Sequence, residues 1–573
     1  MNMKSRSCGS TGDGSGRIHS PTRGMRRLSL CLALGLSVAG FAVSFDLAPS
    51  GRYLAVPVEN GAPKVLLEVF DGGTRIAYDQ VEWARGVTNW TGSLDLRGFT
   101  GRTLSFRFSG KEVPALGASA LAFSDAPVPA PPGQFGEPWR PQFHFTPPLG
   151  WSNDPNGLSW RNGEWHLFYQ HNPFGVRWGN MHWGHAVSKD LVRWRDLGDV
   201  LAPDDAGPMF SGCAVTDVAG TAGFGKGAHV LVYTAAGKPH TQRLAWSLDG
   251  RTYAKWPAAA VEGRPDANRD PKVIWYAPGR HWVMAVYGEV ERERHGVSFF
   301  TSKDLKTWTW ASRACGDRFG AGGYLYECPD FFELPVEGET TSRWVLTAAN
   351  RQYAVGSFDG RTFVPEVERL EQTRPLGGVN PVYAWQTFSD APGGRRVQMA
   401  WARFDALAGG RTDVMFNQGM TLPMELKLVR TASGLRLARF PVKELESLRT
   451  GPATAFQAFT GELAEVEFSC TPVADAQVTL DLRGVKVAYS AVARTLSVNG
   501  QAMAWDLDAR GRLGLRIFVD RVGVDIFSLD GLQYTPLCNI APDPANRTVS
   551  WRAGGVKTPV RDVVEKVWPL CPR

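Results

Sequence analysis

The 573-residue sequence contains no uninterrupted apolar run of the roughly 18 residues that a helix needs to span a bilayer. A shorter apolar run, Leu28–Val43, follows Arg26 and Arg27 and ends in small residues, which is the pattern of a secretory signal peptide. We therefore expect residues 1–42 to be a leader. The rest of the chain should carry no membrane anchor, and the protein should be secreted or periplasmic.

A strong charge of one sign is also missing from most of the chain. The formal net charge is +7, but residues 1–27 hold six basic side chains against the single acid Asp13. The basic excess therefore belongs mainly to the expected leader. It gives no reason to expect a nucleic acid or an anionic membrane as a partner.

Cysteine and histidine are scarce, with 8 and 10 copies, and no spacing typical of a zinc site occurs. We expect no metal and no cofactor. The six cysteines beyond the leader should be mostly free buried thiols with one bridge near the C-terminus, for which Cys538 and Cys571 are the first pair to test. These six are Cys213, Cys315, Cys328, Cys470, Cys538 and Cys571.

Glycine, proline and tryptophan are plentiful, with 63, 38 and 21 copies, which indicates many turns between aromatic-rich strands. Alternating apolar and polar residues over 43–124 predict a small β-sandwich-like module, and the Pro-rich residues 125–140 predict a stiff linker. Alternating strands resume after about residue 428. A C-terminal β-sandwich over 428–573 is expected.

An internal repeat fills the stretch between these two parts. A Ser-x-Asp motif starts at Ser188, Ser247, Ser302 and Ser357, and a hydrophobic strand repeats in step with it five times. A period near 50 residues of strand and turn is typical of a β-propeller. The sequence thus predicts an all-β protein whose residues 141–427 form a five-bladed propeller.

Three acidic motifs lie near the starts of these units. They are Trp151-Ser152-Asn153-Asp154-Pro155-Asn156-Gly157, Arg269-Asp270-Pro271 and Glu327-Cys328-Pro329. Each motif alone fits a structural turn, since Asn, Asp, Pro and Gly favour turns. A propeller, however, gathers one strand end from every blade at its central channel. We therefore expect the three acids to converge on one site.

Taken together and in this order, the three motifs resemble those of glycoside hydrolase family 32, the invertase, inulinase and levanase family. The resemblance covers about residues 141–573. It extends to Phe168-Tyr169-Gln170-His171-Asn172-Pro173, to Trp178-Gly179-Asn180-Met181-His182-Trp183-Gly184-His185 and to Phe210-Ser211-Gly212. It implies a carbohydrate substrate of the fructan or sucrose type.

The resemblance also implies a role for each acid. Asp154 would be the nucleophile of a retaining glycosidase, Glu327 its acid/base, and Asp270 a catalytic-site acid that binds the fructosyl hydroxyls. Further positions that match residues of the fructosyl pocket are Asn153, Gln170, Trp178, Phe210, Ser211 and Arg269. Core packing would explain these six equally well from the residues alone.

The segment Phe416–Leu426 looks most like bacterial levanases and exo-fructanases, so levan or inulin is a better expectation than sucrose alone. The sequence leaves two alternatives open. A fructosyltransferase would use the same acids with a sugar in place of water, and a non-catalytic fructan-binding protein would share the fold. It also leaves the oligomeric state open.

Overall fold

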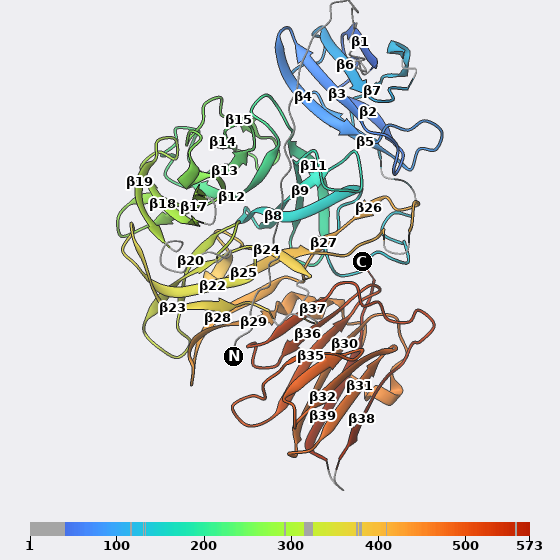
Figure 1. Ribbon diagram of the computed structural model, residues 1–573, viewed down its shortest axis with the longest axis vertical. Helices are drawn as coiled ribbons and strands as arrows, with labels where there is room; N and C mark the ends of the chain where they lie inside the picture. The colour runs from blue at the N-terminus through green and yellow to red at the C-terminus, as the bar shows by residue number, and fades with distance from the viewer. Residues whose placement is uncertain are drawn as a thin grey trace, which may run out of the picture. The chain divides into compact units, whose positions relative to one another are not determined.

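The computed structural model describes residues 41–114, 117–129, 131, 133–291, 294–314, 325–373, 376, 381–407, 410–555 and 559–572 (Figure 1). The regular secondary structure of these residues is almost wholly β-strand, and the prediction of an all-β protein is confirmed. Within them no helix is long and apolar enough to cross a membrane. Of the expected leader, only Phe41 and Ala42 are described, and they open the first strand. The helical elements are short 3-10 turns, η1 (Ala118–Ala120), η2 (Pro265–Ala267), η3 (Pro392–Gly394), η4 (Lys443–Leu448) and η5 (Phe456–Ala458).

The N-terminal module consists of two sheets with the strand orders β1-β6-β3-β4 and β5-β2-β7. Burial alternates along its strands, as the period of two in the sequence predicts. The buried faces share one hydrophobic cluster. The strands are β1 (Phe41–Leu47), β2 (Tyr53–Val58), β3 (Val65–Asp71), β4 (Thr74–Val81), β5 (Trp90–Asp95), β6 (Leu104–Gly110) and β7 (Ala122–Ser124).

Five successive sheets follow, and four strands of each form an antiparallel meander. The first holds β8 (Gly150–Arg161), β9 (Glu164–Asn172), β10 (His182–Ser188), β11 (Trp194–Leu201) and β26 (Phe416–Asn417). The second holds β12 (Met209–Asp217), β13 (Ala228–Ala235), β14 (Thr241–Ser247) and β15 (Ala254–Lys255). The third holds β16 (Arg269–Tyr276), β17 (His281–Glu291), β18 (Arg294–Ser302) and β19 (Thr309–Ala314).

The fourth sheet holds β20 (Asp330–Pro335), β21 (Ser342–Thr347), β22 (Gln352–Phe358) and β23 (Phe363–Glu371). The fifth holds β24 (Val382–Thr387), β25 (Val397–Ala402), β28 (Met424–Thr431) and β29 (Gly434–Pro441), with β27 (Gly419–Met420) beside β25. Neighbouring sheets touch through their first strands, from β8 round to β24. The ring closes because β24 also contacts β8 and β26 pairs with β8 in parallel. The β-propeller prediction is confirmed.

The repeated Ser-x-Asp motif forms the turn after the third strand of a blade. In the first blade, the Asp190 carboxylate accepts backbone N–H groups of Val192 and Arg193 at 3.0 and 2.7 Å, and Ser188 Oγ donates to it at 3.0 Å. Asp304 holds the equivalent turn of the third blade in the same way. The repeat therefore records a turn that each blade needs.

The expected boundary between propeller and sandwich, after residue 427, is wrong. It falls inside β28, and the fifth sheet continues through β29 to Pro441. These two outer strands alternate buried and exposed side chains as sandwich strands do, so the period alone could not separate them. The last residue of the expected linker, Arg140, is packed into the protein and is not part of a free spacer. The Arg140 guanidinium is fully buried and lies 3.5 Å from the centre of the Phe416 ring.

The C-terminal part is a sandwich of two five-stranded sheets, β37-β36-β35-β30-β39 and β34-β33-β32-β31-β38, over one hydrophobic cluster. Its strands are β30 (Ala464–Pro472), β31 (Gln477–Leu482), β32 (Val485–Ser490), β33 (Thr495–Val498), β34 (Gln501–Ala504), β35 (Leu513–Val519), β36 (Val524–Ser528), β37 (Tyr534–Leu537), β38 (Val549–Gly554) and β39 (Val560–Pro569).

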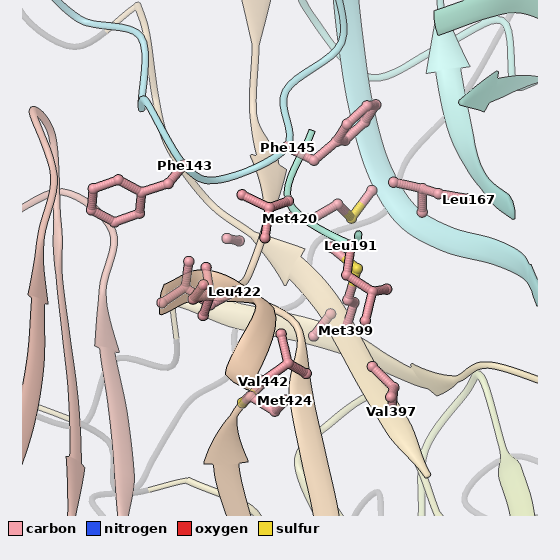
Figure 2. Close-up of a cluster of buried hydrophobic side chains, with 14 of the residues drawn as sticks. Phe143, Phe145, Leu167, Leu191, Val397, Met399, Met420, Leu422, Met424 and Val442 are labelled. Atoms are coloured by element: carbon pink, nitrogen blue, oxygen red, sulfur yellow. The ribbon is translucent and has the colours of Figure 1, made fainter. Parts of the chain in front are cut away.

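A second hydrophobic cluster joins this sandwich to the first and fifth blades (Figure 2). Phe143 and Phe145 point in opposite directions from one segment, and their rings meet Phe518 of the sandwich and Tyr169 of β9. Cys538 belongs to this cluster and Cys571 packs against it, yet both are free thiols. The expected bridge between them is therefore absent. Cys213, Cys328 and Cys470 are free as well, and Cys315 lies outside the described residues.

His144, between the two phenylalanines, is buried and contacts two carboxylates of the sandwich. Its Nδ1 lies 2.9 Å from Asp520 and its Nε2 lies 2.9 Å from Asp525. Burial alone would lower the pKa of His144, but the two carboxylates outweigh it and raise this pKa to about 9. The histidine therefore carries a proton that stabilises the junction.

We predict that His144→Gln lowers the melting temperature by several degrees at pH 6 and that this deficit shrinks toward pH 10. A raised histidine pKa stabilises the fold fully below the unfolded value near 6.5, by up to about 3 kcal/mol, and this contribution is lost as the pH rises through 9. Scanning calorimetry of both proteins across this range measures the deficit. A deficit that is constant or grows with pH would contradict the assignment.

Candidate active site

Four inner strands of the propeller break their pairing register, three of them at residues that the sequence singles out. In β8 the break spans Asn153 and Asp154, in β12 it falls at Ser211, and in β16 it spans Asp270. The break in β24 lies between Tyr383 and Gln386. Such bulges turn a side chain out of the regular alternation, and they aim these groups away from the packing between blades.

The backbone at the second and third acidic motifs lies in the left-handed region. The φ angles are 64° at Asp270, 57° at Glu327 and 40° at Cys328. Each such residue costs free energy on the order of 1–3 kcal/mol and persists only where its surroundings hold it. At Asp270 the backbone N–H donates to Thr234 Oγ1 at 2.9 Å, which is part of that support.

Asp154 is half-buried and accepts hydrogen bonds on both carboxylate oxygens. Ser211 Oγ donates to Oδ2 at 2.7 Å, and Asn153 Nδ2 donates to Oδ1 at 3.2 Å. Burial raises the pKa of Asp154, the bonds from Ser211 and Asn153 oppose this rise, and the charge of Glu327 adds to it. The two neighbours therefore support the ionised form of a carboxyl group in an environment that disfavours charge.

Asp270 is buried and lies against the residue that follows Glu327. The Cys328 backbone N–H donates to Asp270 Oδ2 at 3.1 Å, and Cys328 Sγ lies 3.5 Å from the same oxygen. Burial first, and then the charge of Glu327, raise the pKa of Asp270 to about 7, with a smaller contribution from Asp154. Arg269 acts in the opposite direction without reversing the shift.

Glu327 is fixed by a guanidinium on one oxygen and a phenol on the other. Arg269 donates to Oε1 from Nε at 3.0 Å and from Nη2 at 2.8 Å, and Tyr383 OH donates to Oε2 at 2.6 Å. The Arg269 guanidinium stacks over the Tyr287 ring at 4.6 Å. Glu327 itself keeps a quarter of its side chain exposed. This carboxyl group is therefore held in one orientation while it stays open to solvent.

Cys328 connects the three acids. Its Sγ lies 3.5 Å from Asp154 Oδ2 as well as from Asp270 Oδ2, and Glu327 is its chain neighbour. Asp154 lies on β8 of the first sheet, Asp270 lies on β16 of the third sheet, and Glu327 lies in the turn that enters the fourth sheet. The three acids act on one another electrostatically. The structure thus brings the three acids together, as the sequence leads us to expect.

The six remaining predicted residues divide into three groups. Asn153 and Ser211 contact Asp154, and Arg269 contacts Glu327. Gln170 is buried and donates from Nε2 to the Met209 carbonyl at 2.9 Å, so it braces β9 against β12.

Trp178 and Phe210 form the third group, an aromatic edge beside Ser211. Their ring centroids lie 6.2 Å apart in an edge-to-face arrangement. The Trp178 side chain is 56% exposed, whereas Phe210 is half-buried. An exposed aromatic ring next to polar groups suits the apolar face of a sugar.

Sequence reasoning gave no role to Tyr383, Gln386 or Cys328. Gln386 Nε2 donates to the Cys328 carbonyl at 3.2 Å and so supports the strained turn. Cys328 was visible as part of a motif. Tyr383 and Gln386 had no signal beyond their place on the first strand of the fifth blade. Among the described residues no group of three or more His, Cys, Asp or Glu side chains could hold a metal ion.

Comparison with known proteins shows that residues 144–441 match the glycosyl hydrolases family 32 N-terminal domain. A levanase of Bacillus subtilis is 36% identical over 496 residues, which cover 76% of this chain and 72% of that protein. An extracellular exo-inulinase of Meyerozyma guilliermondii is 37% identical over half of this chain and 59% of its own length. The crystal structure of an exo-inulinase from Aspergillus awamori aligns with 76% of this chain and 99% of its own, at a TM-score of 0.66 and 26% identity.

We predict that Asp270→Asn raises the melting temperature by a few degrees at pH 8 and leaves it unchanged at pH 4. An acid whose folded pKa is raised destabilises the fold as the pH climbs from its unfolded value near 3.8 to about 7. Asparagine removes this charge and keeps an acceptor for the Cys328 N–H. Thermal unfolding at both pH values measures the effect, and a loss of stability at pH 8 would show that the carboxylate is not strained.

Proposed function

The chain belongs to glycoside hydrolase family 32, and we propose that it is a retaining β-fructofuranosidase that releases fructose from fructans such as levan or inulin. The observation that carries this proposal is the meeting of Asp154, Asp270 and Glu327 around Cys328, with Asp154 on β8, Asp270 on β16 and Glu327 in the turn just before β20. Levanase and exo-inulinase relatives support the choice of substrate class.

In the first step of the proposed reaction, a carboxylate oxygen of Asp154 bonds to the ketose carbon C2 of a terminal fructosyl unit. The bond from C2 to the glycosidic oxygen breaks, and Glu327 gives its proton to that oxygen. In the second step water attacks C2, Glu327 takes the proton of the water, and the ester to Asp154 is released. Two displacements at C2 leave the released fructose with the configuration of the substrate.

The surroundings of the two acids suit these separate roles. Asp154 accepts from Ser211 and Asn153, so its charge is available for attack although burial opposes it. Glu327 is oriented by Arg269 and Tyr383 and remains partly open to solvent, as a group that exchanges protons with water requires. Arg269 and Tyr383 are therefore positioning residues for Glu327.

Asp270 is proposed to bind hydroxyl groups of the fructosyl ring. Its pKa is raised by burial and by the charge of Glu327, so hydroxyl donors from a substrate would relieve part of the cost of ionising it. The transition state carries positive charge on the ring, so a carboxylate there stabilises it more than it stabilises the substrate. Trp178 and Phe210 would receive the apolar face of the sugar chain.

Export of the protein is proposed on three grounds. Leu28–Val43 is an apolar run after two arginines, as in signal peptides, and exo-inulinase relatives are described as extracellular. A fructan polymer is also too large to enter a cell by simple passage. An external site of action fits this substrate.

We predict that Asp154→Asn lowers the rate of fructan hydrolysis by several orders of magnitude and that Glu327→Gln lowers this rate roughly 10²–10⁴-fold. Both changes remove the group that forms or breaks a bond and keep the side-chain volume. Asp249→Asn, in a structural turn of the second blade, is the matched control and should keep normal activity. Reducing-sugar release with levan measures all three. Near-normal turnover by either site variant would overturn the proposed roles.

We predict that the purified protein releases fructose alone from levan and inulin from the first minutes of reaction. Removal of terminal units one at a time gives no oligosaccharide. Chromatography of early products separates the outcomes. Oligosaccharides from the start would mean internal cleavage, lengthened products would mean fructosyl transfer, and no product from levan, inulin or sucrose would refute the function.

A further inference from the structure

The loop between β9 and β10 carries Trp178, and the N-terminal module forms hydrogen bonds with the backbone of this loop. We call residues 173–181 the Trp178 loop. The Trp90 indole Nε1 on β5 donates to the Pro173 carbonyl at 3.1 Å, and the Glu82 backbone N–H donates to the Phe174 carbonyl at 3.2 Å. These bonds fix the start of the loop.

The end of the Trp178 loop is fixed by the module as well. The Asn180 side chain pairs with the backbone of Gln80 on β4, accepting its N–H at 2.8 Å and donating to its carbonyl at 2.8 Å. Directly after the loop, His182 lies 2.9 Å from Asp79, also on β4, and 3.2 Å from Asp199 of β11. Both ends of the loop are thus tied to the module, the start to β5 and to Glu82 after β4, and the end to β4.

Apolar packing adds to these bonds. Phe174 and Val176 of the loop are buried in the same hydrophobic cluster as the core of the module. A Cβ atom at Gly92 of β5 would lie 2.8 Å from the Phe174 ring, so only glycine permits this close approach. The module and the loop therefore share one core and do not merely touch.

The module also holds a second segment of the propeller, just before β26. Asn60 Nδ2 donates to the carbonyls of Thr412 and Val414. The Trp178 loop is also tied to β26, which directly follows that segment, because Asn417 Nδ2 donates to the Val176 carbonyl at 3.1 Å. The module thus fixes both segments as a pair.

Each segment leads to the candidate site through a short chain of contacts. Trp178 meets Phe210, whose neighbour Ser211 donates to Asp154. On the other side Gln418 accepts from the Trp401 indole at 3.2 Å. The Trp401 ring in turn meets Trp151, and the Trp151 indole donates to Asn153 at 2.9 Å.

We propose that the N-terminal module is a positioning element of the substrate site, with Trp90 and Asn60 acting through the Trp178 loop and the segment before β26. The Trp178 ring is 56% exposed and meets Phe210 edge to face, so its direction over a substrate depends largely on the backbone of its loop. The module fixes the Trp178 ring indirectly, because its hydrogen bonds hold both ends of the loop that carries the ring. This inference rests on the proposed fructan hydrolase function for its kinetic test.

Trp90→Phe tests the proposal with the smallest change, because it deletes the N–H donor to Pro173 and keeps a ring in the core. We expect KM for levan to rise about 3- to 10-fold, the effect of one lost hydrogen bond, with kcat and the pH profile unchanged. Asn60→Ala should behave alike. A fall in kcat as large as the rise in KM would refute a positioning role. An unchanged KM in both variants would refute it as well.

A double-mutant cycle with Trp178 separates positioning from general support. Trp178→Ala removes a largely exposed ring and should itself raise KM. In that background Trp90→Phe should add less than twofold, because the ring that it positions is gone. A full additional effect of Trp90→Phe would mean that the module acts by another route and would overturn the proposal.

Phe106→Leu is the matched control, since Phe106 is buried in the module core on β6, where its ring meets Phe123 of β7. It should lower stability and leave KM unchanged, and a KM rise like that of Trp90→Phe would refute the proposal. Amide hydrogen exchange of residues 173–181 should quicken in Trp90→Phe and not in Phe106→Leu. This measurement does not depend on activity. If the wild-type protein proved inactive, the proposed function would be refuted, and the exchange rates would still test whether the module orders the Trp178 loop.

Discussion

The structure is organised around the repulsion of three carboxyl groups held close together at the strand ends of a ring of sheets. Burial and mutual charge raise the pKa values of Asp154 and Asp270, so the arrangement costs free energy that the rest of the fold must offset. The backbone adds to the cost, with left-handed residues at Asp270, Glu327 and Cys328. Only a rigid frame can keep such a cluster together. The closed ring, in which β24 and β26 return to β8, is that frame.

The donors around the acids decide what each carboxyl group can do. Ser211 and Asn153 donate to Asp154, which favours its charged form. Asp270 accepts from the Cys328 backbone N–H and shares the Cys328 thiol with Asp154. Glu327 differs again because a guanidinium and a phenol fix its direction. Chemically identical groups thus acquire different properties from their neighbours. This is the physical basis for assigning them separate roles.

Much of this arrangement could be predicted from the sequence because its signals are local. The Ser-x-Asp turns recur with the blade period, since every blade needs the same turn after its third strand, and the acids sit in short motifs next to proline. Tyr383 and Gln386 were missed because they reach Glu327 and Cys328 only after the ring has closed. The boundary at residue 427 failed for a related reason. β28 and β29 have the alternation of sandwich strands, and only pairing with β25 reveals that they belong to the fifth blade.

A propeller fixes the strand ends at its centre far better than it fixes the loops around its rim, because loops receive no ladder of backbone hydrogen bonds from the sheets. A site that reads a long substrate needs order in both places. The module provides that order by burying Phe174 and Val176 in its own core and by pairing the backbone of β4 with Asn180. Linker residue Arg140 strengthens the same junction, since it is buried against Phe416, which belongs to that cluster. Because the segment before β26 is anchored there too, the parts of the chain that flank the acids share one support. The module therefore supports the substrate side of the site, as the closed ring of sheets supports the three carboxyl groups.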